Sequence, residues 1–275
     1  MKNFYKKTSN LRIDILDSIF LAKSGHPGGC LSCVDLIYYI FKNYLNYKKN
    51  FFRKLDRNYF VLSKGHCAPA LYAVVNELGI IKKKEMLSLR KINSLAQGHT
   101  HLTQKNLWMG ANTGSLGQGF SFAIGYALGL KKINSKKKVF TILGDGELQE
   151  GEIWEGAMFS SHHNLNNLCA IIDYNKLQSD EKVKNIINVE PLKQKWLSFG
   201  WKVLSIDGHN YYQIKKVIDN FFKKPQKKPT LIIANTIKGK GVKFMEKNPF
   251  WHGSVKITLE QLNKAKNEIK NAKKK

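Results

Sequence analysis

The chain has 275 residues and a hydrophobic content of 43%, which suits one globular α/β domain with a large buried core. We predict a single domain over residues 1–275. There is no run of eighteen apolar residues, and the first residues lack the apolar segment of a secretory signal. These features argue against a membrane protein and favour a cytoplasmic one.

The formal net charge of +26 suggests nucleic-acid binding as one possible function. However, only four of the 46 basic residues are arginine, and the other 42 are lysine. Arginine is the preferred side chain for base and phosphate recognition, and lysine and asparagine are spread over the whole chain. We therefore interpret the charge as a compositional bias that favours anionic, phosphorylated ligands, and we expect no specific nucleic-acid site.

Short apolar runs bounded by turn residues alternate with segments of helical periodicity, which predicts a parallel sheet built from βαβ units. Strands are expected at 59–62, 139–143, 168–172, 201–206 and 230–236. Helices are expected at 10–23, 32–44 (with Ser32 as N-cap), 70–78, 80–89, 120–130, around 153–158, and at 194–199, 212–222 and 258–270. The predicted fold is α/β, a doubly wound, mostly parallel sheet with helices on both faces.

The central βαβ unit carries a candidate metal site. Asp145 follows the strand at 139–143, and Asn175 follows the next strand, thirty residues on. Ligands of open α/β sheets lie at the carboxyl ends of the strands. A carboxylate, an amide oxygen and the backbone carbonyl of Leu177 are hard oxygen ligands that suit Mg2+, with Ca2+ or Mn2+ as substitutes. Gly144 and Gly146 allow the backbone to approach a diphosphate closely. A solvated acidic loop is the simpler alternative for this turn alone.

Four histidines lie in turn-like segments and are candidates for binding anions and transferring protons. They are His26 in a Ser-Gly-His-Pro-Gly-Gly cluster, His66 after the strand at 59–62, His99 and His252. For His26, a capping role in a turn is the alternative if the motif is taken by itself.

A glycine-rich loop, 113–119, opens the helix at 120–130. No clear strand precedes it and its spacing is not that of a Rossmann loop. Tight helix packing would also favour these glycines. Cys30 and Cys33 have the spacing of a redox or zinc motif, but no second ligand pair follows, so we interpret them as helix-packing residues.

The string GDGELQEGEIWEGAM, followed by DYNKLQSD, resembles the transketolase family, and GDG followed by Asn175 resembles the thiamine diphosphate fingerprint. The resemblance implies thiamine diphosphate and Mg2+ as cofactors, with Asp145 and Asn175 as metal ligands and Asp173 orienting them. It implies that Gly114 lies near the aminopyrimidine and Leu116 beneath the cofactor rings.

The histidines and one glutamate also have counterparts in the family. The resemblance implies that His26, His66 and His252 face the diphosphate and the substrate. Residues Thr100 and His101 follow His99, where the family usually has Pro-Glu. Glu150 matches a family glutamate at a subunit interface. We interpret Glu155 as a helix-surface charge and the sequence Asp207-Gly208-His209 as structural.

The resemblance covers nearly all of this sequence but less than half of a transketolase. The pyrimidine-binding and C-terminal domains are not in the sequence, which implies an N-terminal subunit that is active only with a separate C-terminal transketolase subunit, in an α2β2 assembly. The expected reaction transfers a two-carbon ketol unit between sugar phosphates, as in the pentose phosphate pathway. The alternatives are a related ketol transferase, including the deoxyxylulose-phosphate synthase type, and a non-catalytic polyanion-binding remnant.

Overall fold

The computed structural model describes residues 1–45, 55–103, 106–179 and 181–272. Asp180, the last residue of the string DYNKLQSD, lies outside these ranges. No helix in the described ranges is long and apolar enough to cross a membrane.

A five-stranded sheet in the order β1-β2-β3-β5-β4 lies at the centre of the fold, and each of its four strand pairings is parallel. The predicted fold class is confirmed. The five predicted strands match the observed ones to within two residues at each end. Their bounds are β1 Tyr59–Leu62, β2 Val139–Gly144, β3 Leu168–Tyr174, β4 Lys202–Asp207 and β5 Thr230–Asn235.

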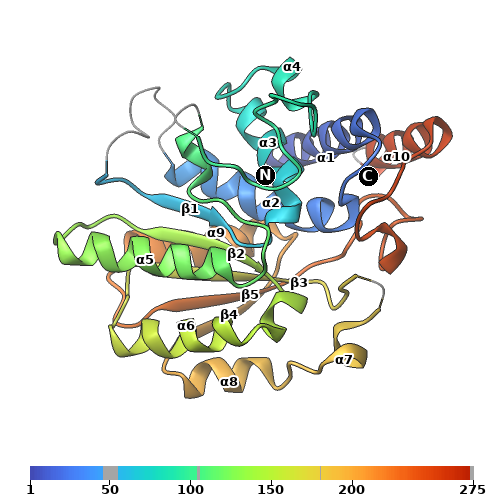
Figure 1. The fold of residues 1–275 in the computed structure, drawn as a ribbon. Coiled ribbons are helices and arrows are strands. Elements are labelled where there is room, and N and C mark those ends of the chain that lie inside the picture. The colour runs from blue at the N-terminus through green and yellow to red at the C-terminus, as the bar shows by residue number, and fades with distance from the viewer. Residues whose placement is uncertain (46–54, 104–105, 180, 273–275) are drawn as a thin grey trace.

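Helices cover both faces of the sheet (Figure 1). One core joins α1, α2, α3, α9 and α10 to one face, and a second core joins α5, α6 and α8 to the other. Alternate residues of each strand enter different cores, as in β1, where Phe60 faces the first core and Val61 the second. The helix bounds are α1 Lys2–Ala22, α2 Pro27–Tyr44, α3 Ala68–Glu77, α4 Lys83–Met86, α5 Gln118–Lys132, α6 Gly151–His162, α7 Val183–Ile186, α8 Leu192–Ser198, α9 Tyr211–Lys223 and α10 Leu259–Ala272.

The prediction for the start of the second helix was wrong. Helix α2 begins at Pro27, which suits the first helical position because its ring fixes φ, and Ser32 lies inside the helix, not at its N-cap. Gly28 and Gly29, which suggested a turn, are helical, whereas Gly25 precedes the helix. A Cβ at Gly28 would lie 2.7 Å from the carbonyl oxygen of Trp251, so glycine is needed there for close packing.

Two further helix predictions need correction. The segment 80–89 is not one helix, since only α4 is helical within it, and Arg90 closes a turn with a positive φ of 63° and a hydrogen bond to Ala96. Helix α1 starts at Lys2, well before residue 10, because Phe4 is buried against the rings of Tyr38 and Tyr211.

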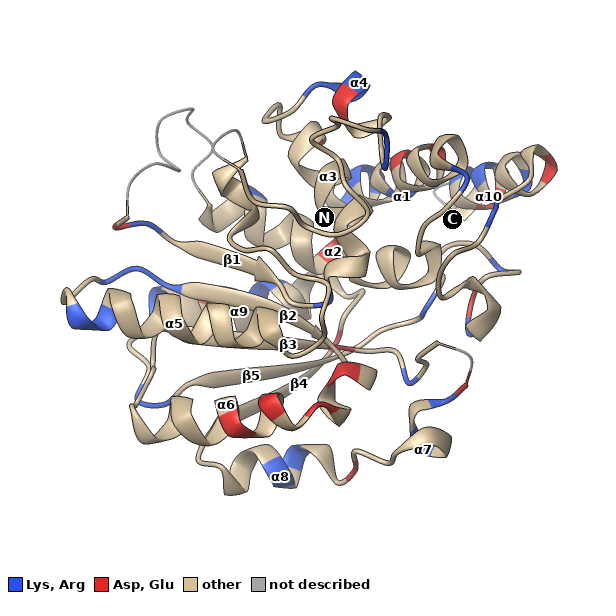
Figure 2. Cartoon of the chain, viewed as in Figure 1, with Lys and Arg blue, Asp and Glu red and all other residues tan. Residues whose placement is uncertain are grey.

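Cys30 and Cys33 are buried and carry no disulfide, in agreement with a packing role. Lysine and arginine occur on α1, α4, α5, α8 and α10 and on several loops, so the positive charge is not confined to one element (Figure 2).

A buried ionic cluster joins α1, α2 and the end of β4. Asp35 accepts two hydrogen bonds from the Arg12 guanidinium, at 3.1 and 2.6 Å, and its Oδ2 lies 2.7 Å from His209 Nδ1. The other ring nitrogen of His209 accepts the backbone N–H of Ile237. Burial alone would raise the pKa of Asp35, but Arg12 and His209 hold it well below its usual range. The structure thus supports a structural role for the sequence Asp207-Gly208-His209.

We predict that Asp35→Ala lowers the free energy of unfolding by about 3–5 kcal/mol at pH 7, because it leaves the buried Arg12 charge without its carboxylate. Breaking the exposed Lys83–Asp14 pair with Lys83→Ala should cost less than about 1 kcal/mol. Urea denaturation of the two variants measures both values. The pKa of Asp35 is lower in the folded state than its value of about 3.9 in the unfolded state. Asp35 therefore contributes its full stabilisation of the folded state above that pH, and the contribution is lost as the pH falls further. Equal losses for the two variants would contradict this assignment.

Candidate active site

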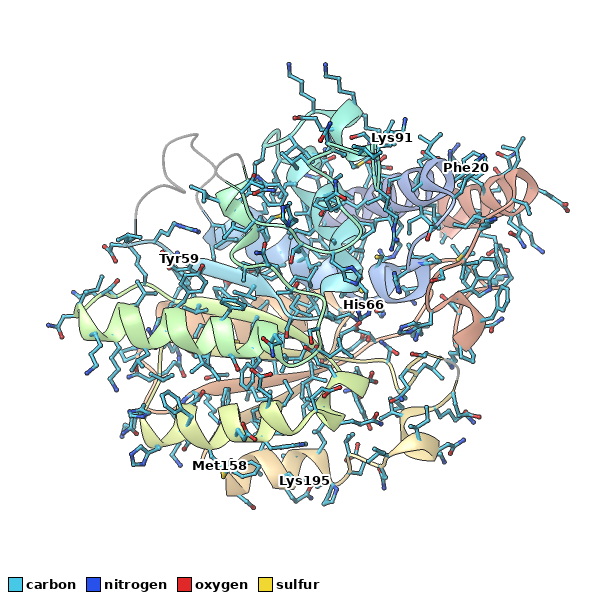
Figure 3. All side chains as sticks on the ribbon, viewed as in Figure 1. Phe20, Tyr59, His66, Lys91, Met158 and Lys195 are labelled. Carbon is cyan, nitrogen blue, oxygen red and sulfur yellow. The ribbon has the colours of Figure 1, made fainter. Side chains whose placement is uncertain are left out.

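A cavity of about 380 Å³ opens at the carboxyl end of the sheet. The segments that follow β1, β2, β3 and β5 each contribute lining residues, as a ligand site of an open α/β sheet requires. Figure 3 labels Tyr59, where β1 begins, and His66, just beyond its end. All twelve candidate residues from the sequence line this cavity, namely His26, His66, His99, Gly114, Leu116, Gly144, Asp145, Gly146, Glu150, Asn175, Leu177 and His252.

The four histidine rings form a cluster although they come from distant segments. The ring centroid of His26 lies 5.1 Å from that of His66, 5.6 Å from that of His252 and 6.2 Å from that of His99. Burial lowers the pKa of His26 to about 4 and that of His252 to about 3, and it also lowers the pKa of His99. These three rings are therefore neutral at pH 7, and each can donate one hydrogen bond and accept another.

The carboxylate of Asp145 lies between the ends of β2 and β3. One oxygen accepts the N–H of Gly146 at 3.0 Å, and the other accepts the N–H of Lys176. Burial and the charge of Asp173 raise the pKa of Asp145 to about 7. A cation at this position would stabilise the ionised form.

Asn175 lies beside Asp145 and is held by its neighbours. Its Oδ1 accepts the N–H of Leu177 at 3.1 Å, and its Nδ2 lies 3.3 Å from Asp173 Oδ2. The donor set of the cavity thus contains a carboxylate, an amide oxygen and a backbone carbonyl, all of which are hard ligands. Gln178 Oε1, also in the lining, is buried and has no hydrogen-bond partner in the described ranges. These residues fit a divalent metal.

Lys238 is a cavity residue that the sequence analysis missed. Its Nζ donates to the carbonyls of Leu177 (3.1 Å) and Gln178 (2.9 Å) and to Nδ1 of His252 (2.7 Å). Because an ammonium can only donate, Nδ1 of His252 accepts and its proton lies on Nε2. Burial and the nearby charge of Lys64 lower the pKa of Lys238 to about 8. A diphosphate in the cavity would therefore meet a positive group that is buried and fixed in position.

Asp173 and Lys64 form a buried ion pair at the wall of the cavity, which Lys64 lines. Lys64 Nζ lies 2.5 Å from Asp173 Oδ2, and the exposed fraction of the Lys64 residue is 2%. Ser32 and Thr236 donate to the same carboxylate. Burial alone would lower the pKa of Lys64, but Asp173 raises it well above its usual range. Asp173 also contacts Asn175, a candidate metal ligand, and its role in orienting a metal site stays a prediction.

Glu147 joins the glycine-rich loop to the central unit and was also missed. Its carboxylate accepts the Ser63 hydroxyl, the N–H of Gly117 at 3.0 Å and the N–H of Gly144 at 2.9 Å. Gly119, at the start of α5, packs so closely that a Cβ would lie 2.5 Å from the Cα of Ser63. These contacts place the loop that carries Gly114 and Leu116 against the cavity.

We predict that Gly119→Ala lowers the free energy of unfolding by about 1–3 kcal/mol, because the added methyl group meets backbone that cannot move freely. Gly129→Ala is the matched control on the same helix, since a Cβ there meets no atom within 4 Å. Alanine at that position should stabilise the protein by about 0.4–1 kcal/mol. Thermal denaturation of both variants checks the assignment, and a Gly119→Ala protein as stable as the parent would contradict it.

A second prediction concerns the pH dependence of stability in the metal-free chain. The folded-state pKa of Asp145 is about 7, above its unfolded value, so the folded state keeps a proton that the unfolded state loses as the pH rises from about 4 to about 7. Over this pH range the free energy of unfolding of the parent chain should fall relative to that of the Asp145→Asn variant. The fall should be on the order of 1.4 kcal/mol for each unit by which the folded-state pKa of Asp145 exceeds the unfolded-state pKa. Denaturant titrations of both proteins at several pH values measure this, and a pH-independent difference would contradict it.

Comparison with known proteins identifies the family. The family model described as the transketolase thiamine diphosphate binding domain matches residues 5–274. A 6-deoxy-6-sulfo-D-fructose transketolase subunit from a Clostridium species is 38% identical over 89% of this chain and 88% of its own length. An apulose-4-phosphate transketolase subunit from Phocaeicola vulgatus is 34% identical over 93% of this chain and 89% of its own.

Other transketolases match over a smaller part of their own length. Human transketolase is 38% identical over 90% of this chain but only 39% of its own length. The crystal structure of transketolase from Campylobacter jejuni superposes with a TM-score of 0.88 and 30% identity, covering 98% of this chain and 43% of that one. The chain thus spans less than half the length of these two relatives. It belongs to the transketolase family, in which it corresponds to the thiamine diphosphate binding domain.

Proposed function

We propose that this chain binds thiamine diphosphate and Mg2+ in the cavity and serves as the diphosphate-binding subunit of a two-chain transketolase. The enzyme would transfer a two-carbon ketol unit from a ketose phosphate to an aldose phosphate. The observation that carries the proposal is the convergence of Asp145, Asn175, Lys238 and the histidine cluster in one cavity at the carboxyl end of the sheet.

The cavity residues divide into three groups. Asp145, Asn175 and the carbonyl of Leu177 would hold the metal, and we expect Ca2+ or Mn2+ to replace Mg2+. Lys238, His66 and His252, with the backbone of Gly144 and Gly146, would face the diphosphate. Gly114 and Leu116 would contact the rings. Thiamine diphosphate, when bound, supplies the electron sink for carbon–carbon bond cleavage and formation.

The histidines would move protons during the reaction. Because the pKa values of His26, His99 and His252 are lowered, their rings are neutral at pH 7 and can either accept a proton from a substrate hydroxyl or donate a hydrogen bond to a carbonyl oxygen. In His252 the contact with Lys238 fixes the tautomer, which leaves Nε2–H as the donor toward the cavity. His26 Nδ1 is buried and has no hydrogen-bond partner in the described ranges.

The proposal includes a separate C-terminal subunit in an α2β2 assembly and a cytoplasmic location. Two relatives that match over most of their length are named as transketolase subunits. Glu150, which is exposed at the start of α6 and lines the cavity, is the residue we propose at the subunit contact. The two relatives are named for different sugars, so the proposal specifies sugar phosphates as a class and not one donor or acceptor.

The test is a ketol-transfer assay with xylulose 5-phosphate and ribose 5-phosphate, using the chain alone and as a complex co-purified with its partner subunit. We predict activity in the complex only, and only with thiamine diphosphate and a divalent metal. Asp145→Ala should lower the rate by about 100-fold or more, because the metal stabilises charge by several kcal/mol.

Glu260→Gln is the matched control, since it removes a carboxylate on the exposed surface of α10 and should leave the rate unchanged. Ketol transfer by the isolated chain would contradict the two-chain proposal. A complex that binds neither thiamine diphosphate nor metal would contradict the proposed cofactor site and favour a polyanion-binding remnant.

A further inference from the structure

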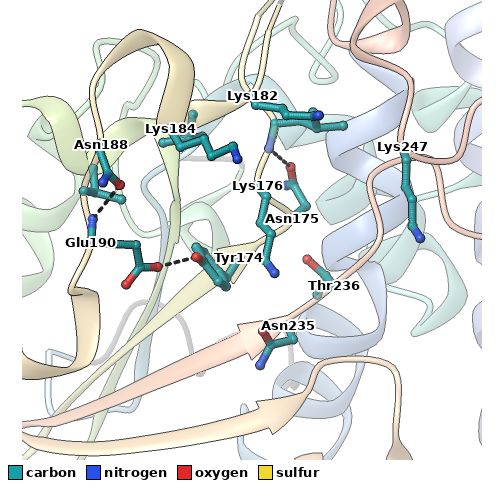
Figure 4. Close-up of a pocket in the computed structure, with 13 residues that line it drawn as sticks. Tyr174, Asn175, Lys176, Lys182, Lys184, Asn188, Glu190, Asn235, Thr236 and Lys247 are labelled. Atoms are coloured by element: carbon teal, nitrogen blue, oxygen red, sulfur yellow. Dashed lines mark hydrogen bonds between the residues drawn. The ribbon is translucent and has the colours of Figure 1, made fainter.

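A second cavity, of about 650 Å³, is lined in part by the segment that follows β3 (Figure 4). It opens at the ends of β3 and β5, where Tyr174, Asn235 and Thr236 line it. Its volume lies in the range of small-molecule sites. The proposed function makes no use of this cavity.

Main-chain hydrogen bonds join several of the described residues that line this cavity. Leu177 and Lys182 form an antiparallel bridge, and the N–H of Val183 donates to the carbonyl of Lys176 at 3.1 Å. On the opposite side, the N–H of Lys247 donates to the carbonyl of Lys238 at 3.0 Å. Both walls are therefore held by main-chain hydrogen bonds.

The lining combines a positively charged rim with apolar surface. Four lysines contribute to the cavity, namely Lys176, Lys182, Lys184 and Lys247, and all four are exposed. In the view of Figure 4, Lys184 and Lys247 lie on opposite sides of the opening, with Lys176 between them. In the described part of the chain, none of these ammonium groups lies within 4.0 Å of a carboxylate.

The lysine content of the chain does not by itself explain this rim. Four of the thirteen lining residues are lysine, whereas 42 of the 275 residues of the chain are. A larger cavity of about 1110 Å³, beside His99, has no lysine among the lining residues that the structure describes. Among the described lining residues the one acidic side chain, that of Glu190, is already engaged, since it accepts the Tyr174 hydroxyl and the N–H of Leu192.

The apolar part of the lining comes from the Tyr174 ring and the side chains of Val183, Val189 and Leu177. Tyr174, the last residue of β3, thus provides an aromatic surface in this cavity. The ring also attracts positive charge, since Lys176 Nζ lies 5.4 Å from its centroid.

We propose that this cavity is a second ligand site that binds a small organic anion, with a phosphate or diphosphate at the lysine rim and a planar ring against Tyr174. A nucleoside diphosphate has this chemistry. Asn175 and Leu177 line both this cavity and the cofactor cavity, so the two sites share a wall. An anion bound here changes the affinity of the chain for thiamine diphosphate. By thermodynamic linkage, thiamine diphosphate changes the affinity for the anion by the same factor.

The test is titration calorimetry of the full chain with ADP and with pyrophosphate, in low salt and with thiamine diphosphate and Mg2+ in excess. We expect Lys184→Gln/Lys247→Gln to weaken ADP binding by about tenfold or more, because two charge-assisted contacts are lost. The matched control, Lys216→Gln/Lys228→Gln, removes the same charge from exposed positions elsewhere and should have no effect. Tyr174→Leu should remove the preference for ADP over pyrophosphate.

Three outcomes would overturn the proposal. If His66→Gln abolishes ADP binding and Lys184→Gln/Lys247→Gln does not affect it, ADP binds in the cofactor cavity. If the two double lysine variants lose the same amount of ADP affinity, the binding is non-specific attraction to a basic protein. If ADP fails to bind, and the Lys184→Gln/Lys247→Gln variant no longer assembles with the partner subunit, the cavity is a protein-docking surface. An unchanged thiamine diphosphate affinity on saturation with ADP would contradict the coupling between the sites.

Discussion

The buried pair of Lys64 and Asp173 is the interaction on which the arrangement of the cavity depends. Asp173 is the last buried residue of β3, the central strand of the sheet. Its carboxylate accepts hydrogen bonds from Ser32 of α2, from Lys64 just after β1 and from Thr236 just after β5. A carboxylate with no exposed surface is costly unless it is paired and hydrogen-bonded. Satisfying it requires all these segments to meet at one point, and that point lies directly behind Asn175 and the histidines.

The strands could be predicted because a buried parallel strand needs a short apolar run, and each of the five runs has clear turn residues at its ends. The errors arose where packing overrides local preference. Glycine and proline at the start of α2 suggest a turn, but Gly28 is helical because Trp251, more than 200 residues away, packs against it. The segment 80–89 has helical spacing, yet contacts such as that of Arg90 with Ala96 close it into turns.

In the candidate site, too, residues marked by local sequence could be predicted, and residues placed by long-range contacts could not. Asp145 and Asn175 could be predicted because parallel strands bring their carboxyl ends to one edge, and the histidines came from the family resemblance. Lys238 and Lys64 could not be predicted. The chain has 42 lysines, and no feature of the neighbouring sequence distinguishes these two buried lysines from the exposed ones. Glu147 lies within the acidic turn itself, but its partners Ser63 and Gly117 are 84 and 30 residues away, and only the folded chain brings them together.

The central claim is that Asp145, Asn175 and the carbonyl of Leu177 hold a divalent metal against a diphosphate in the cavity. The most direct measurement is a crystal structure of the chain with its partner subunit, thiamine diphosphate and Mn2+, in which anomalous scattering locates the metal. We predict an anomalous peak within coordinating distance of these three oxygens, with the diphosphate beside Lys238 and His252. A peak elsewhere, or a cofactor bound away from the histidine cluster, would contradict the account.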